Sequence, residues 1–184
     1  MMSLSHAVAA TAGAALAVGL YKYLSSHAAT VGPPCNGTSS IEVYYWGPHP
    51  GINFYGRGIG IYLTLNQAGV EYEKKPQQDL PANKAFAVPC VCIDGTFMGQ
   101  TPAILTVLGQ KFGLAGTTDH EKMAVLQAVE DLNDIFGEHK KFVEDEERKD
   151  KWFTYLEAKM EGKQWMGGTS SPTIADFHGV FAFE

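Results

Sequence analysis

The chain has 184 residues, of which 45% are hydrophobic and 18% charged, so it can bury a core in one domain or in two small ones. A net charge of -6, without a basic stripe carrying interleaved aromatic residues, argues against a nucleic-acid partner. The three cysteines, Cys35, Cys90 and Cys92, are too few for a disulfide framework, and no His or Cys elsewhere completes a metal site. We interpret Cys90 and Cys92 as small buried hydrophobic residues of a protein in a reducing compartment.

The first 25 residues contain an apolar segment, 4–24, that is rich in Ala and Gly. Its apolar part is short for a membrane span, which needs about 20 residues, so the core of a signal peptide is one alternative. However, no Arg or Lys precedes it. We predict a retained N-terminal helix that spans or lies in a membrane, with Ala9, Gly13 and Ala17 forming a face of small residues for a partner helix. An amphipathic or buried soluble helix is the other alternative.

A linker rich in Ser, Thr, Gly and Pro is predicted at 26–40. Residues 41–46 are mostly β-branched and aromatic, which predicts the first strand of a sheet. After a turn rich in glycine and proline, a helix is predicted at 59–68 and a second strand at 70–73. This order of strand, helix and strand predicts a βαβ unit.

The stretch 86–108 carries the clearest local pattern. A short apolar run ends in the turn pair Asp94-Gly95, a second short run follows, and an amphipathic helix begins near Gln100. Thr101 followed by Pro102 predicts a hydroxyl at the N-cap and proline at the first helical position. The free N–H groups of such a helix start favour a carboxylate or a phosphate. A plain β-hairpin followed by a capped helix is the alternative interpretation.

Val88-Pro89 lies where the first strand of this hairpin begins, so Pro89 is predicted to be either an edge-strand proline or a cis proline. In both cases the backbone N–H and C=O of Val88 remain available for a ligand. The run from Val88-Pro89 through Asp94-Gly95 to Gln100-Thr101 resembles the glutathione-binding half of cytosolic glutathione transferases. The resemblance implies that the Val88 backbone, before cis Pro89, pairs with the cysteinyl part of glutathione, and that Gln100 and Thr101 hold its γ-glutamyl end.

In the tyrosine-type members of that family, the first strand ends in a tyrosine whose hydroxyl hydrogen-bonds the glutathione sulfur and lowers its pKa. The resemblance places Tyr45 in this role, and Gly56-Arg57 resembles the Gly-Arg pair that follows. The turn between them is longer here by several residues, so Tyr55 is a second candidate. A purely structural role of these tyrosines is the alternative. The resemblance also implies a basic or aromatic residue for the glycine carboxylate of glutathione, and Lys84 is our candidate.

The resemblance implies an α/β thioredoxin-like domain of order βαβ-ββα at 41–115, followed by an all-α domain at 116–184. Apolar residues at helical spacing from Met123 to Phe136 predict the first helix of the second domain. The charge run 144–151 predicts a solvated loop or a helix start, and 152–160 a further helix.

Thr173 with Asp176 three residues later resembles the capping box of that family's second domain. In the family the capped helix continues, and further helices follow it. We therefore expect either a truncated second domain or a tail beyond Glu184.

The resemblance implies a glutathione transferase, with glutathione as co-substrate and a small hydrophobic electrophile or a peroxide as its partner. With the N-terminal segment, it predicts a membrane-tethered enzyme whose globular part lies in the cytosol or in an organelle matrix or stroma. The alternative is a catalytically inactive accessory subunit of a membrane protein complex, bound through the N-terminal helix. The longer turn after Tyr45 and the short C-terminus favour that alternative. A thiol–disulfide oxidoreductase lacks its Cys-x-x-Cys pair.

Overall fold

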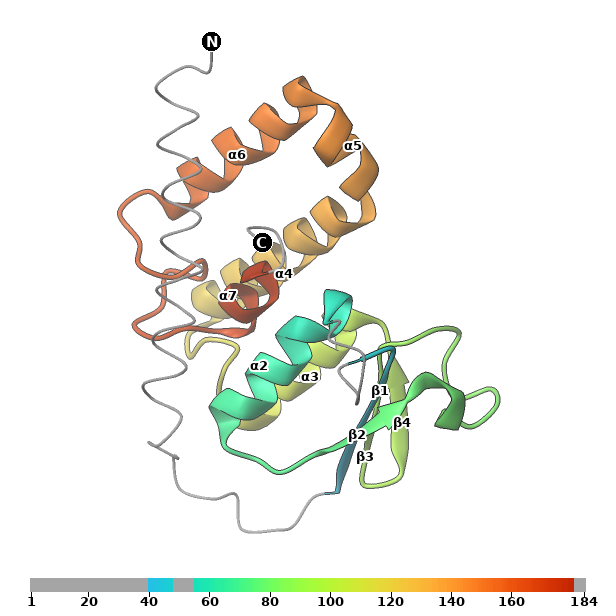
Figure 1. Ribbon diagram of the computed structural model, residues 1–184. Coiled ribbons are helices and arrows are strands. Elements are labelled where there is room, and N and C mark those ends of the chain that lie inside the picture. The colour runs from blue at the N-terminus through green and yellow to red at the C-terminus, as the bar shows by residue number, and fades with distance from the viewer. Residues whose placement is uncertain (1–39, 48–54, 181–184) are drawn as a thin grey trace.

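The computed structural model of the chain describes residues 40–47 and 55–180. The described strands form one four-stranded sheet. Figure 1 shows helices α2 and α3 beside this sheet, and helices α4 to α7 beyond those two. The predicted N-terminal helix at 1–25 and nearly all of the predicted linker at 26–40 lie outside the described residues. Within the described part of the chain, every helix is too short or too polar to cross a membrane.

The sheet has the strand order β2-β1-β3-β4, in which β1 runs parallel to β2 and antiparallel to β3, and β3 runs antiparallel to β4. Helix α2 connects β1 to β2, and helix α3 follows β4. This confirms the predicted thioredoxin-like order. The elements are β1 (Ile41–Tyr45), α2 (Ile59–Ala68), β2 (Glu73–Pro76), β3 (Cys90–Ile93), β4 (Thr96–Gly99) and α3 (Thr101–Phe112), with short 3-10 turns at Gly56–Gly58 and Gln77–Asp79.

Alternation along β1 and β3 divides the sheet into two apolar faces. Val43 and Tyr45 of β1, with Val91 of β3, belong to the main core that α2 and α3 complete. Tyr44, Cys90 and Cys92 form a smaller cluster with Phe97, on the opposite face of the sheet. Both cysteines are free and buried, as predicted. Tyr45 therefore faces the helices, and Tyr44 faces away from them.

The second strand begins three residues later than the predicted range 70–73. Helix α2 ends in a Schellman motif, in which Gly69 takes a φ of 65° and the N–H groups of Gly69 and Val70 donate to carbonyls of the last helical turn. Because Val70 is used to end the helix, strand pairing starts only at Glu73. The strand itself, Glu-Lys-Lys-Pro, is an edge strand whose charges and proline protect it from pairing with another chain.

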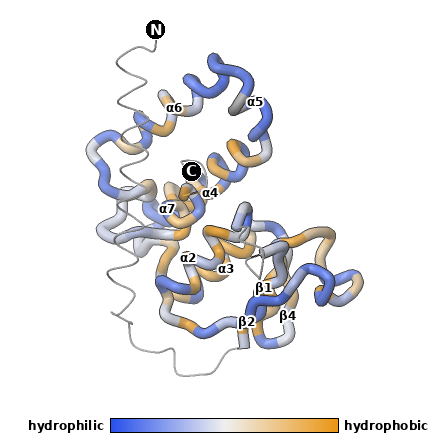
Figure 2. Tube along the Cα trace, in the orientation of Figure 1, coloured by the Kyte–Doolittle hydropathy of each residue, from blue (hydrophilic) through white to orange (hydrophobic). Residues whose placement is uncertain are grey.

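The second half of the chain is helical, as predicted. Helix α4 (Asp119–Gly137) is followed by α5 (His139–Glu144), α6 (Glu146–Met160) and the buried α7 (Ile174–Gly179). Within the charge run 144–151, residues 146–151 begin α6 and Asp145 is its N-cap. The short helix α5 had no counterpart in the sequence prediction. Figure 2 shows that α5 and α6 are largely hydrophilic, and Leu156 is the one buried residue of α6.

The prediction of the apolar face of α4 is wrong for two residues, Met123 and Leu126. The side chains of Met123 and Leu126 are 70% and 45% exposed, and the helix packs instead through Val125 and the residues that share its face. These are Ala128, Val129, Leu132 and Ile135.

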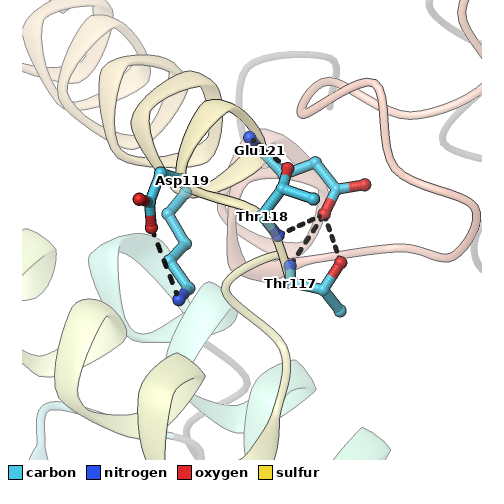
Figure 3. Close-up of polar contacts among 5 residues, drawn as sticks. Thr117, Thr118, Asp119 and Glu121 are labelled. Atoms are coloured by element: carbon cyan, nitrogen blue, oxygen red, sulfur yellow. Dashed lines mark hydrogen bonds and ion pairs between the residues drawn. The ribbon is translucent and has the colours of Figure 1, made fainter.

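A capping box fixes the start of α4 (Figure 3). One oxygen of the Glu121 carboxylate accepts the hydroxyl of Thr117 at 2.6 Å and the backbone N–H groups of Thr117 and Thr118 at 2.8 and 2.9 Å. The Thr118 hydroxyl accepts the Glu121 N–H at 3.2 Å. These hydrogen bonds, led by the Thr117 hydroxyl, lower the pKa of Glu121 to about 2. The carboxylate is thus ionised at neutral pH, where it also suits the positive end of the helix.

The predicted capping box of Thr173 and Asp176 is confirmed at the start of α7. The Asp176 carboxylate accepts the Thr173 N–H at 2.8 Å and its hydroxyl at 2.9 Å, and it also accepts the Met166 N–H at 2.8 Å. All six residues of α7 are buried, and the helix packs against α2 and α4. Gly60 of α2 makes this possible, since a Cβ there would lie 3.0 Å from the His178 Cα.

We expect Asp176→Ala to lower the free energy of unfolding by about 2–4 kcal/mol, because two buried backbone N–H groups lose their acceptor. Asp119→Ala is the matched control. Its carboxylate is 99% exposed and makes only a 4.0 Å ion pair, so it should cost less than about 1 kcal/mol. Urea unfolding of both variants tests this, and equal losses would contradict it.

His178 should make the stability depend on pH. Burial, and secondarily the positive charge of Arg57, lower the pKa of His178 from 6.5 to about 4. The unfolded chain therefore binds this proton at a higher pH than the folded chain does. Stability should be complete above about pH 6.5 and should fall as the pH drops towards about 4, by roughly 3 kcal/mol in total.

Urea unfolding between about pH 4.5 and about pH 7.5 measures this slope. His178→Gln should flatten it, whereas His120→Gln should leave it unchanged, because His120 is exposed. An unchanged slope in His178→Gln would assign the pH dependence to other groups.

Candidate active site

Predicted site residues from β1, from the start of β3 and from the start of α3 meet at one end of the sheet. Because β1 and β4 each run antiparallel to β3, the ends of β1 and β4 lie beside the start of β3. Tyr45 is the last residue of β1, Val88-Pro89 directly precedes β3, and Gln100-Thr101 directly follows β4. The Val88-Pro89 peptide bond is cis. Strand register therefore brings together five of the seven residues that the sequence singles out.

The Tyr45 side chain points into the main core and is only 3% exposed. Its hydroxyl oxygen accepts the backbone N–H of Arg57 at 2.9 Å. Burial raises the pKa of Tyr45, while the N–H groups of Arg57 and Gly58 and the charge of Arg57 lower it. Since burial dominates, the phenol keeps its proton at neutral pH. A hydroxyl that accepts through its lone pairs can still donate this proton to a ligand.

Tyr55 has different neighbours. It is 39% exposed, and its ring packs edge-to-face on Tyr62 with 6.1 Å between the centroids. Tyr62 in turn stacks on Tyr72 at 5.9 Å, and the Lys74 ammonium lies 5.5 Å from the Tyr62 centroid. Tyr55 thus belongs to an aromatic cluster beside the edge strand β2, and its predicted catalytic role stays an alternative to that of Tyr45.

The helix start differs from the prediction by one residue. Gln100 is the N-cap, so Thr101 occupies the first helical position and Pro102 the second. Gln100 has a φ of 70° and a ψ of 111°, because the chain turns from β4 into α3 within this single residue. The Thr101 side chain is buried, the Gln100 side chain is exposed, and no side chain caps the helix. Its first N–H groups therefore point to a ligand or to solvent.

Lys84 lies in the segment that leads to β3, and it is exposed. Its ammonium is 5.2 Å from the centroid of Phe97, a residue of the smaller apolar cluster. Its predicted contact with the glycine carboxylate of glutathione remains a prediction.

Arg57 and Gly58 are site residues whose roles the sequence did not reveal. A Cβ on Gly58 would lie 2.9 Å from Cδ1 of Tyr45 and 3.1 Å from Cε2 of Tyr62, so only glycine fits between these rings. The Arg57 guanidinium reaches α4, where it lies 4.4 Å from the Phe136 ring centroid. The Gly-Arg-Gly sequence was the available signal, but the residues that it contacts are distant in the chain.

Comparisons with known proteins find glutathione S-transferases. No protein-family model matches the chain. Glutathione S-transferase 1 of Ascaris suum is 35% identical over 89 residues, which are 45% of this chain and 43% of that protein. Glutathione S-transferase 3 of Caenorhabditis elegans is 34% identical over 85 residues, 43% of this chain and 41% of that protein. The chain thus spans less than half the length of the curated relatives that it matches.

Solved structures extend the similarity to most of the chain. The crystal structure of a glutathione S-transferase from Ascaris lumbricoides matches with a TM-score of 0.62 and 27% identity, over 75% of this chain and 76% of that one. A glutathione S-transferase of Caenorhabditis elegans matches with a TM-score of 0.64 and 25% identity, over 78% and 80%. Sequence and structure similarities together support the cytosolic glutathione transferase superfamily as the family of this chain. This agrees with the resemblance of the sheet and its helix starts to those of glutathione transferases.

In this glutathione transferase fold, we expect Gly58→Ala to disturb the Tyr45 ring and to cost about 1–3 kcal/mol, because the new methyl group overlaps two aromatic side chains. Gly137→Ala is the matched control, since nothing lies within 4 Å of its Cβ position. It should leave stability unchanged or raise it slightly. Thermal and urea unfolding compare the two variants, and a neutral Gly58→Ala would show that the rings can move apart freely.

Proposed function

We propose that this chain is a glutathione transferase, which adds the thiolate of glutathione to a small hydrophobic electrophile or transfers electrons from it to a peroxide. The observation that carries the proposal is the Tyr45 hydroxyl. It is protonated, held by the Arg57 N–H at 2.9 Å, and lies at the sheet end where Val88 and the start of α3 also lie. The similarity to glutathione S-transferases supports the same proposal.

Glutathione would bind along this end of the sheet. The backbone of Val88 would pair with its cysteinyl part next to Pro89, and Gln100 and Thr101 would hold the γ-glutamyl carboxylate at the helix start. Lys84 would approach the glycine carboxylate. The thiol would then lie near Tyr45, whose O–H can donate to the sulfur only while the phenol is neutral.

The Tyr45 hydrogen bond would favour the thiolate over the thiol, because it stabilises the negative sulfur. The thiolate would attack an electrophilic carbon and form a C–S bond, while the leaving group departs with the electron pair of its own bond. With a peroxide, the sulfur would attack one oxygen, the O–O bond would break, and the alkoxide would take up a proton. A second glutathione would convert the resulting sulfenic acid to the disulfide and water.

The membrane tether is a further part of the proposal. It rests on the apolar composition of 4–24 alone, which lies outside the described residues. In this proposal the globular part lies in the cytosol or in an organelle matrix or stroma, where glutathione is reduced and the free Cys90 and Cys92 stay reduced.

We expect Tyr45→Phe to lower kcat/KM about 10- to 100-fold near neutral pH, because a hydrogen bond to a charged group contributes about 1.5–3 kcal/mol. Tyr55→Phe should change it less than about twofold, because its ring packs on Tyr62 at the edge of the sheet. Conjugation of glutathione to a chloronitroaromatic electrophile, followed by absorbance across a pH series, measures both variants.

The first control measures retention on immobilised glutathione. It uses the full chain in mild detergent, as the wild type and as the variants Gln100→Ala and Thr101→Ala. Loss of retention in these variants is expected. If the wild type is not retained, the proposal that this chain is a glutathione transferase is refuted. Retention without turnover of any electrophile or peroxide would favour the inactive accessory subunit. Equal rates in the wild type, Tyr45→Phe and Tyr55→Phe would remove both hydroxyls from the mechanism.

A further inference from the structure

Arg57 links the sheet to helix α4, because its backbone contacts the sheet and its side chain contacts the helix. Its backbone N–H donates to the Tyr45 hydroxyl oxygen at 2.9 Å. Its guanidinium donates through Nη1 to Oδ1 of Asn133 at 3.4 Å, and Cζ lies 4.4 Å from the centroid of the Phe136 ring. Asn133 and Phe136 both belong to α4, three residues apart and therefore on neighbouring positions of one helix face. One residue thus contacts the reacting end of the sheet and the helical half of the chain.

The backbone around Arg57 depends on this anchorage. Arg57 is the middle residue of the short 3-10 turn Gly56–Gly58, so a glycine precedes it and another follows it. Glycines restrict the backbone least, and Gly56 takes a φ of 37°. Two backbone hydrogen bonds close the turn, from the Gly58 N–H to the Tyr55 carbonyl at 2.8 Å and from the Ile59 N–H to the Gly56 carbonyl. In so short a turn between glycines, the contacts that hold the Arg57 side chain contribute to the direction of its N–H.

The position of Arg57 matters because its charge acts on the titratable groups around it. The charge of Arg57 lowers the pKa of two groups. One is Tyr45 at the end of β1, and the other is His178 in α7. Tyr62 of α2 is a further titratable group near Tyr45, and Tyr62 also interacts with Tyr55 and Tyr72. Arg57 is the cation among these groups, so a shift of its guanidinium changes the field at the phenol directly.

We propose that Asn133 and Phe136 are positioning residues for the reaction, which hold Arg57 so that its N–H and its charge set the donor strength of the Tyr45 hydroxyl. Neither residue needs to touch glutathione or the electrophile. The inference rests on the proposed function for its catalytic consequence, although the link from α4 to Tyr45 can be tested without glutathione.

The test compares Asn133→Ala and Phe136→Leu with the conservative variant Phe136→Tyr, which keeps an aromatic face for the guanidinium. The matched control is Gln127→Ala, which removes another polar contact of α4, the 2.8 Å hydrogen bond to Asp131. The ultraviolet absorbance of the thiolate reports the pKa of bound glutathione. Asn133→Ala and Phe136→Leu should each raise this pKa and lower kcat about 3- to 10-fold near neutral pH, as expected for loss of a partly buried cation–π or polar contact.

The dissociation constant of glutathione should stay within about twofold in these variants, because the lost contacts lie away from the tripeptide. Phe136→Tyr and Gln127→Ala should retain the thiol pKa and kcat of the wild type. A changed affinity with an unchanged thiol pKa would overturn the inference, since it would show a binding role instead of a positioning one.

A second readout does not depend on glutathione. Tyrosine labelled with ¹³C at Cζ gives an NMR signal for Tyr45, which Tyr45→Phe assigns, and this signal should shift in Asn133→Ala and Phe136→Leu but not in Gln127→Ala. If the wild type fails to bind glutathione, the proposed function fails while this signal still tests the link. If Phe136→Leu unfolds, the half-buried Asn133 carries the test. An unmoved Tyr45 signal in a folded Asn133→Ala variant would overturn the inference.

Discussion

The close approach of α2 and α7 is the constraint on which the rest of the structure depends. It requires a glycine, because a Cβ at Gly60 would come within 3.0 Å of the backbone of His178. The six buried residues of α7 reach this position through the Asp176 cap, which also ties down the segment around Met166. Since α2 continues directly from the turn that contains Arg57, its packing on α7 also determines where Arg57 meets Tyr45.

Burial sets the protonation states at this junction. Bringing α7 against α2 removes His178 from water next to a cation, and both effects favour its neutral form. The same removal from water keeps Tyr45 protonated, while the nearby N–H groups and the Arg57 charge polarise its hydroxyl. A protonated phenol whose oxygen is held by N–H groups is a better hydrogen-bond donor than an isolated one. The packing that stabilises the fold therefore also sets the hydrogen-bonding state of the Tyr45 hydroxyl.

Most of the architecture could be predicted from the sequence because it is encoded locally. The β-branched and aromatic content of β1, the Asp94-Gly95 turn and the Thr173 cap each depend on a few neighbouring residues. The errors arose where two local signals competed. Val70 is β-branched, but the Schellman motif of α2 uses its N–H. The apolar repeat of α4 contains two overlapping stripes, and burial selected the one that faces α7.

The Tyr45 site shows the limit of such reasoning in another way. From the sequence, the long turn between Tyr45 and Arg57 left the position of the hydroxyl open, and in the structure the Arg57 N–H lies 2.9 Å from its oxygen. The contact joins the end of a strand to the start of a helix, and core packing fixes both of these ends. The length of the chain between two fixed points changes the entropy of closing the loop only slowly and does not move the points. The packing of α2 on α7 and the contacts of Arg57 with α4 both join segments that are far apart in the sequence, so they leave no local pattern.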